Sequence, residues 1–334
     1  MQQHWTHRRR MRNVRMTTHC SSTEARMSRI SDILVATDFS PRAELAVTHA
    51  ARLAQHHKAV LHMLHVLPTL AWQMFGRALV EHPLVTEAQL FESAAKRLRA
   101  LAEAQQAQTG GSVRHHVVIG RTHEEIAGYV HAHPIDLLVL GAHGENFVHD
   151  LFIGGTATKV LRATAHPTLI VRSGASMNAD YRHLLVPVDF SAASRLALTV
   201  AARIAPQAAI QVLHVYEAEF ESKMQYAGVD EAVIQQYRDA AAQEAQRIME
   251  RFLHAMEGHE RMSPLVMHGS PASIILSQAE ALRPDLVVMG KRGHSELDEM
   301  LLGSVTKHVL EESDRDVLLV APDHTGTSGN LLAA

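Results

Sequence analysis

Short uninterrupted apolar runs alternate along the chain with longer segments in which apolar residues recur at helical spacing. Residues 33–36 and 184–188 are runs of the first kind, typical of strands that other elements cover on both faces. Ser40 and Pro41 follow the first run, and this pair favours the start of a helix at residue 41. In the first half, the pattern predicts strands at 33–36, 59–67, 113–119, 136–140 and 168–172, and helices from 41 onward and at 84–108, 122–132 and 156–164.

The second half of the chain repeats the first with an offset of about 150 residues. Residues 33–40 (ILVATDFS) recur as 184–191 (LLVPVDFS), and 134–141 (PIDLLVLG) recur as 283–290 (RPDLVVMG). The repeated segments keep their order, which chance similarity does not do across several segments. The pattern therefore indicates an internal duplication.

Strands that alternate with helices predict a parallel sheet with right-handed crossovers in each copy. We expect an α/β protein of two tandem, doubly wound, Rossmann-like domains. Each would hold a five-stranded parallel sheet in flavodoxin-like order, flanked by helices. The predicted divisions are a disordered leader at 1–27, domains at 28–173 and 181–322, a linker at 174–180 and a disordered tail at 323–334.

Composition narrows the class of protein. The net charge is −3, from 32 basic and 35 acidic residues, which argues against a nucleic-acid or acidic-lipid surface. The single cysteine, Cys20, rules out an internal disulfide and fits a reducing cytoplasm. No apolar run has the length of a membrane span, so we expect a cytoplasmic protein. The Arg-rich residues 1–26 favour a disordered leader or a start codon assigned too early, with a transit peptide or a basic arm as the alternative.

Candidate chemistry lies where the predicted strands end, because doubly wound sheets bind ligands beyond the carboxyl ends of their strands. Asp38 and Asp189 each end the first strand of a copy, and a glycine-rich segment follows each fourth strand. In the second copy, residues 290–293 (GKRG) are followed by nine residues and then Gly303-Ser304. The N–H groups of residues 303–306 open the last predicted helix, where they would face an anion. The hydroxyls of Ser304 and Thr306 add donors, and Lys291 and Arg292 add positive charge.

The spacing Gly-x-x-Gly, nine residues, Gly-Ser resembles the nucleotide-binding motif of the universal stress protein family. The segment VPVDFS at 186–191 and His214-Val215 strengthen the resemblance, which covers nearly all of residues 28–322. It implies ATP as the ligand, with Mg²⁺ on its phosphates, and places ribose and adenine near Asp189 and the Val215 backbone. The implied site of the second domain is Asp189, Val215, Met289, Gly290, Arg292, Gly293, Gly303, Ser304, Val305 and Thr306.

The first copy departs from this motif. It reads Gly141-Ala142-His143-Gly144, nine residues, then Gly154-Gly155-Thr156, so a glycine replaces the hydroxyl residue and the Lys-Arg pair is absent. A lost charge-assisted hydrogen bond costs about 1.5–3 kcal/mol, or one to two decades of affinity. We therefore expect the second domain to bind more tightly. The weaker site predicted in the first domain is Asp38, Val66, Gly141, His143, Gly144, Gly154, Gly155 and Thr156.

Each candidate also has a plain structural interpretation. The aspartates would satisfy backbone groups at a strand end, and the glycines would serve tight turns. The 25 histidines suggest metal binding, but His62 and His65 are three apart in a predicted strand and face opposite sides. We therefore predict no metal site. We also predict no catalytic residues, because no nucleophile or phosphate-loop motif is present.

The resulting hypothesis is an adenine-nucleotide-binding sensor or regulator of a stress response. The alternatives are a slow Mg²⁺-dependent ATPase using Asp189, and an interaction scaffold that does not depend on nucleotide. The resemblance implies dimerisation through the edges of the last strands. Residues 168–172 and 317–320 would then pair the two halves within one chain. A homodimer and an unidentified protein partner are further expectations.

Overall fold

The computed structural model describes residues 30–68, 87–142, 153–172, 181–218, 220–293 and 302–322. The predicted leader, linker and tail lie outside the described residues. Within the described ranges, no helix has the length and apolar character needed to cross a membrane.

Each half alternates strands with helices, as the apolar pattern predicts. The first half contains β1 (Asp32–Ala36), α2 (Pro41–His57), β2 (Val60–Pro68), α4 (Glu87–Thr109), β3 (Val113–Gly120), α5 (Thr122–Ala132), β4 (Leu137–Gly141), α6 (Gly155–Ala163) and β5 (Thr168–Val171). The second contains β6 (His183–Pro187), α7 (Ala192–Ile204), β7 (Ala209–Tyr216), α8 (Glu221–Tyr226), α9 (Glu231–His254), η1 (His259–Arg261), β8 (Met262–His268), α10 (Pro271–Leu282), β9 (Leu286–Gly290), α11 (Ser304–Glu312) and β10 (Asp316–Val320). The short α8 and η1 were not predicted.

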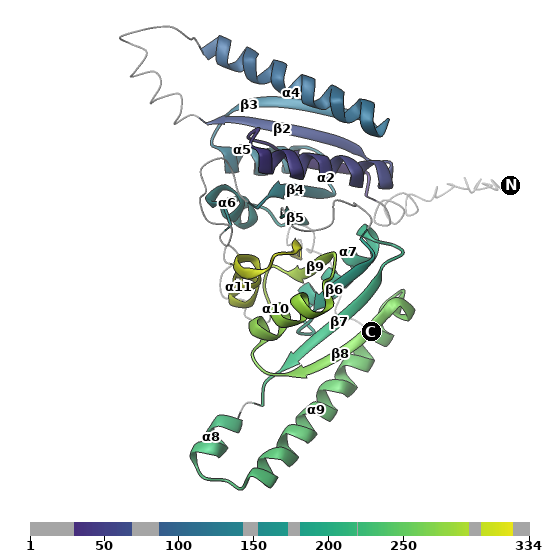
Figure 1. Ribbon diagram of the computed structural model, residues 1–334, viewed down its shortest axis with the longest axis vertical. Helices are drawn as coiled ribbons and strands as arrows, with labels where there is room; N and C mark the ends of the chain where they lie inside the picture. Colours follow the sequence, from purple (N-terminus) through teal and green to yellow (C-terminus); the bar gives the residue numbers. More distant parts are fainter. Residues whose placement is uncertain are drawn as a thin grey trace, which may run out of the picture.

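One ten-stranded sheet runs through both halves in the order β3-β2-β1-β4-β5-β10-β9-β6-β7-β8 (Figure 1). Strands within each half are parallel, whereas β5 and β10 pair antiparallel, with Ile170 opposite Val317. This pairing confirms that the last strands join the two halves. We call the β5–β10 boundary and the side chains that cross it the seam.

The strand order within each half is 3-2-1-4-5, so the predicted flavodoxin-like order is wrong. The cause lies in the second crossover. Helix α4 packs beside α2 on one face of the sheet, and the strand that follows it, β3, pairs with β2 at the edge of the sheet. In the flavodoxin-like order, β3 would instead lie next to β1. Helix α5 then returns on the opposite face to β4, which pairs with β1. The fold class is confirmed, in the Rossmann order.

Two apolar layers hold the helices to the sheet. One layer joins α2, α4, α7 and α9 through residues such as Leu53, Leu98 and Met249. The other joins α5, α6, α10 and α11 through residues such as Ile126 and Val309. The chain changes face between β1 and β4, and again between β6 and β9, so each half has a switch point at the carboxyl ends of these strands.

Helix starts position the chain at each switch point. Ser40 caps α2 by accepting a hydrogen bond from the Ala43 N–H, and Pro41 follows it. Ser191 caps α7 in the same way through the Ser194 N–H. Both serines come two residues after the predicted ligand aspartates, so the caps fix the turns that carry Asp38 and Asp189.

Candidate functional site

A cavity opens at each switch point. In the second half, it has a volume of about 220 Å³, and all ten residues predicted for that domain line it. In the first half, the cavity measures about 590 Å³, and six of the eight predicted residues line it. The other two, His143 and Gly144, lie outside the described residues. The six are Asp38, Val66, Gly141, Gly154, Gly155 and Thr156.

The two aspartates sit on identical strained turns. Asp38 accepts a hydrogen bond from the Ser40 N–H at 3.0 Å, and Asp189 accepts one from the Ser191 N–H at 3.1 Å. The residue between each pair is a phenylalanine in the left-handed region, with φ of 63° at Phe39 and 65° at Phe190. A bulky side chain rarely adopts this conformation, and such strain often marks functional positions. Each carboxylate therefore satisfies backbone groups and lines a cavity.

A histidine supports each turn. The Nδ1–H of His65 donates to the Thr37 carbonyl at 2.8 Å, and its ring lies 4.2 Å from that of Phe39, centre to centre. His214 repeats this arrangement with Val188 and Phe190. Burial lowers the pKa of both imidazoles, which favours the neutral ring. Their role is to hold the turn, which the sequence did not reveal.

Close packing explains two of the glycines in the second half. A Cβ on Gly293 would overlap the Asp189 Oδ2 atom, so only glycine lets the loop approach the carboxylate. A Cβ on Gly290 would lie 2.9 Å from the Ala193 Cβ, inside van der Waals contact. Gly303 differs, because an added Cβ there would meet its nearest neighbours at 3.5 Å.

Three expected ligand donors have other partners. The Lys291 side chain is buried and donates to the Thr164 carbonyl across the seam, so it does not add charge to the cavity. The Gly303 N–H donates to the Lys291 carbonyl at 2.9 Å. The Thr306 hydroxyl donates to the Gly290 carbonyl at 2.9 Å. The last two bonds join the glycine loop to the start of α11, a closure that the sequence motif does not show.

The start of α11 keeps groups that suit an anion. Its N-cap, Gly303, has no side chain to bond the N–H groups of the first turn. Ser304 and Val305 line the cavity in that turn, and Arg292 faces it from the loop. In the first half, α6 likewise starts after an uncapped Gly154. Helix N-termini of this kind attract phosphates and carboxylates.

The structure adds lining residues that sequence reasoning missed. In the second half, the Ser194 hydroxyl donates to Asp189 Oδ1 and lines the cavity, where the first half has Ala43. In the first half, Lys159 of α6 lines the cavity. Position 308, the counterpart of Lys159, holds histidine. The position of Ser194, five residues after Asp189, could have identified it from the sequence. Lys159 lies outside the glycine motif, so the motif could not have identified it.

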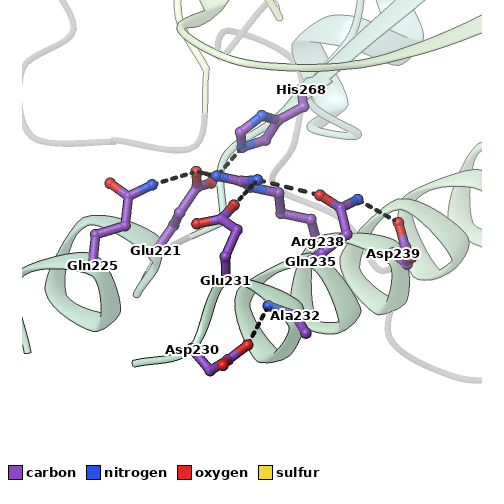
Figure 2. Close-up of polar contacts among 9 residues, drawn as sticks. All are labelled: Glu221, Gln225, Asp230, Glu231, Ala232, Gln235, Arg238, Asp239 and His268. Carbon is purple, nitrogen blue, oxygen red and sulfur yellow. Dashed lines mark hydrogen bonds and ion pairs between the residues drawn. The ribbon is translucent and has the colours of Figure 1, made fainter. Parts of the chain in front are cut away.

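An ion-pair network forms at the outer end of β8 (Figure 2). Glu221 of α8 pairs with Arg238 of α9, and its other oxygen lies 3.0 Å from the His268 Nε2 atom. The His268 ring also contacts that of Tyr216, which follows the cavity residue Val215. The network therefore attaches α8 to α9 and to the carboxyl end of β8.

Fold and site together define a pair of doubly wound α/β domains in one chain, each with a cavity at its switch point. The sequence profile of the universal stress protein family matches residues 30–172 and again 180–321. The chain therefore belongs to the universal stress protein family, as a tandem of two such domains.

Individual relatives agree with the duplication. Universal stress protein YxiE of Bacillus subtilis is 33% identical over 146 residues, which is 42% of this chain and 99% of the relative. Universal stress protein MJ0577 of Methanocaldococcus jannaschii is 28% identical over 157 residues, 43% of this chain and 97% of the relative. A universal stress protein from Archaeoglobus fulgidus shares the fold over both halves of the chain. It has a TM-score of 0.63 at 19% identity, covering 87% of this chain and 98% of that one.

Proposed function

We propose that this protein binds adenine nucleotides, with ATP and its Mg²⁺ as the principal ligand, and acts as a sensor or regulator in a stress response. The observation that carries the proposal is the convergence of all ten predicted residues on one cavity at the second switch point. The cavity combines apolar strand ends, such as Val215 and Met289, with a carboxylate and an uncapped helix start. These features suit a base, a ribose and phosphates in turn.

The residues present fit a magnesium nucleotide. Among the described lining residues of the second cavity, Asp189 is the acidic side chain and suits the ribose hydroxyls. Mg²⁺ would be held by the phosphates of the nucleotide, as is common for this ion. Arg292 supplies positive charge for the remaining phosphate oxygens. Bound Mg²⁺ would neutralise phosphate charge, while Asp189 and the α11 N–H groups orient the ligand.

The two domains offer different balances of space and charge. The first cavity, at about 590 Å³, falls in the usual range for small-molecule sites, whereas the second, at about 220 Å³, lies below it. The second domain has the charge of Arg292 and the hydroxyl of Ser304, and the first has Lys159. That the second domain binds more tightly stays a prediction.

The test uses one carboxylate to block each site. Ser304 and Gly155 are equivalent, exposed first residues of α11 and α6. An acidic residue there suits the helix dipole, and an added Cβ at Gly155 meets nothing within 4 Å. A carboxylate about 4 Å from a phosphate charge costs about 4 kcal/mol at an effective dielectric of 20. We expect Ser304→Glu and Gly155→Glu each to lower the affinity of its own site by at least about 100-fold.

Calorimetric titration with Mg·ATP measures these affinities, with Ser304→Ala and Gly155→Ala as uncharged controls. The parent should show two binding events, each glutamate variant one, and the double variant none. Thermal unfolding should show that both glutamate variants are as stable as the parent. A parent free of bound nucleotide that gives neither heat nor a thermal shift would refute the proposal and leave the scaffold. Phosphate release that is lost in the double variant would identify the slow ATPase.

A further inference from the structure

The Lys291 side chain connects the glycine loop of the second domain to the first domain. Its backbone is fixed on both sides: the N–H donates to the Val320 carbonyl at 2.7 Å, and the carbonyl accepts from the Gly303 N–H at 2.9 Å. Its side chain is only 4% exposed, and Nζ donates across the seam to the Thr164 carbonyl, with the His166 carbonyl at 3.5 Å. A residue of the second site's loop therefore contacts the far half directly.

The contact falls at the end of the helix that forms the first site. Thr164 is the C-cap of α6, and its N–H bonds the Val160 carbonyl. The other end of α6 supplies Gly155, Thr156 and Lys159 to the first cavity. At 1.5 Å per residue, this nine-residue helix is about 13 Å long. A cation at the C-terminus of a helix is stabilising, because the unpaired carbonyls concentrate negative charge there.

A reciprocal contact runs the other way. Arg172 follows Val171, whose carbonyl accepts the N–H of Ala142 in the first glycine segment. Its guanidinium donates to the Leu310 carbonyl in α11, the helix whose first turn lines the second cavity. Lys291 of the second site's loop thus holds the far end of α6, and Arg172, at the end of β5, holds the far end of α11.

The lysine is not a requirement of the fold. Ala142 occupies the position equivalent to Lys291 in the first half and is likewise buried. The first half forms the equivalent strand and helix without a cation there. Burial of a lysine is costly unless its charge is paired. Among the described residues, the recorded partners of Nζ are carbonyl groups and not a carboxylate, so the presence of a lysine on one side needs a reason beyond packing.

We propose that these two contacts couple the nucleotide sites, so that a ligand in either domain raises the affinity of the other, with Lys291 as the main positioning residue. The inference rests on the proposed nucleotide binding. Burial, and then the charge of Arg292, lower the pKa of Lys291 to about 7. A phosphate beside Arg292 offsets that repulsion and strengthens the charge that Lys291 presents to Thr164 and His166. The stronger charge on Lys291 fixes the carboxyl end of α6 and so orders its first turn, which lines the first cavity. By thermodynamic linkage, a ligand in the first cavity raises the affinity of the second by the same factor.

The first experiment compares two-site titrations of the full chain with Mg·ATP. Ser304→Glu and Gly155→Glu give the affinities of the separate sites, and the parent gives them together. We expect the parent to bind its second equivalent at least about fivefold more tightly than independent sites would. In Lys291→Met, this factor should fall below about twofold. Lys307→Met is the matched control, because Lys307 lies on α11 in an exposed pair with Glu311, and it should keep the full factor.

A second measurement does not depend on a comparison of affinities. In Gly155→Glu, only the second site is open, so Mg·ATP should slow hydrogen exchange at the Thr164 and His166 amides across the seam. Lys291→Met combined with Gly155→Glu should abolish this effect. If Lys291→Met does not fold, Arg172→Met interrupts the reciprocal contact and should lower the coupling factor likewise.

Two results would overturn the inference. Independent binding at two sites in the parent, with unchanged exchange at Thr164, refutes the coupling alone and leaves nucleotide binding intact. Coupling that survives in both Lys291→Met and Arg172→Met refutes the role of these contacts. A parent that binds no Mg·ATP at all refutes this inference together with the proposed function.

Discussion

Replacing Gly293 with alanine tests why this position needs glycine. Close packing against Asp189 predicts a specific loss of affinity, whereas membership of the motif alone predicts no difference from other motif glycines. The added Cβ would overlap Asp189 Oδ2, so either the carboxylate or the loop has to move by about 1 Å to reach ordinary contact. The carboxylate is the harder to move. Its Oδ1 accepts hydrogen bonds from the Ser191 N–H, the Ser191 hydroxyl and the Ser194 hydroxyl, each worth about 1.5–3 kcal/mol to a charged group.

We therefore expect the loop to retreat and to take Arg292 and the Gly303 N–H bond with it. Forced shifts of this kind typically cost about 1–3 kcal/mol. If the ligand contacts bear the whole cost, affinity for Mg·ATP at the second site falls by roughly five- to 150-fold. Calorimetry in the Gly155→Glu background isolates the second site and gives this number directly.

Gly303→Ala is the matched control, because it changes another glycine of the same motif. Its Cβ has only ordinary contacts at 3.5 Å, and its φ of −58° suits any residue. The expected loss is limited to a weaker N-cap, at most about 1 kcal/mol. Equal losses of affinity in Gly293→Ala and Gly303→Ala would refute the role of close packing at Gly293. The two glycines would then matter only as members of the same motif.

Two further predictions concern stability. Because burial lowers the pKa of Lys291 from 10.5 to about 7, the unfolded chain binds a proton there that the folded chain has lost. The parent's free energy of unfolding should therefore rise between pH 7 and 10.5, by up to about 1.4 kcal/mol per pH unit, relative to Lys291→Met. Denaturant titrations at several pH values measure this slope, and parallel curves would contradict it. Thr306→Val removes the buried hydroxyl bond to the Gly290 carbonyl and should cost about 1–3 kcal/mol. The exposed Thr199→Val should change stability by less than about 0.5 kcal/mol in the same thermal assay.

The internal repeat, and the alternation of continuous apolar runs with apolar residues at helical spacing, were enough to predict most of the fold. The helix predicted at 122–132 is α5, and the strand predicted at 168–172 is β5, with one residue fewer. Serine caps and proline mark the start of α2 in the sequence itself. Strand order was not predictable in this way, because it depends on which face α4 takes, and both faces of a parallel sheet are equally apolar.

The candidate site shows the same division between local and distant information. Motif spacing brought Asp189, Gly293 and Ser304 together, because each follows a strand end or opens a helix. It misplaced the Lys291 side chain, since a buried lysine that reaches carbonyls of the other half depends on the seam, which no local pattern describes. Lys159 was missed because it lies one turn inside α6, beyond the motif.

The antiparallel pairing of β5 with β10 has a consequence for how such a protein changes over time. The two edges belong to one chain, so their pairing is intramolecular and dilution does not separate them. In a pair of identical chains, every substitution appears on both sides. Here Lys291 faces the other half while its counterpart is Ala142. Joining the halves therefore lets one side carry a charge that the other side lacks.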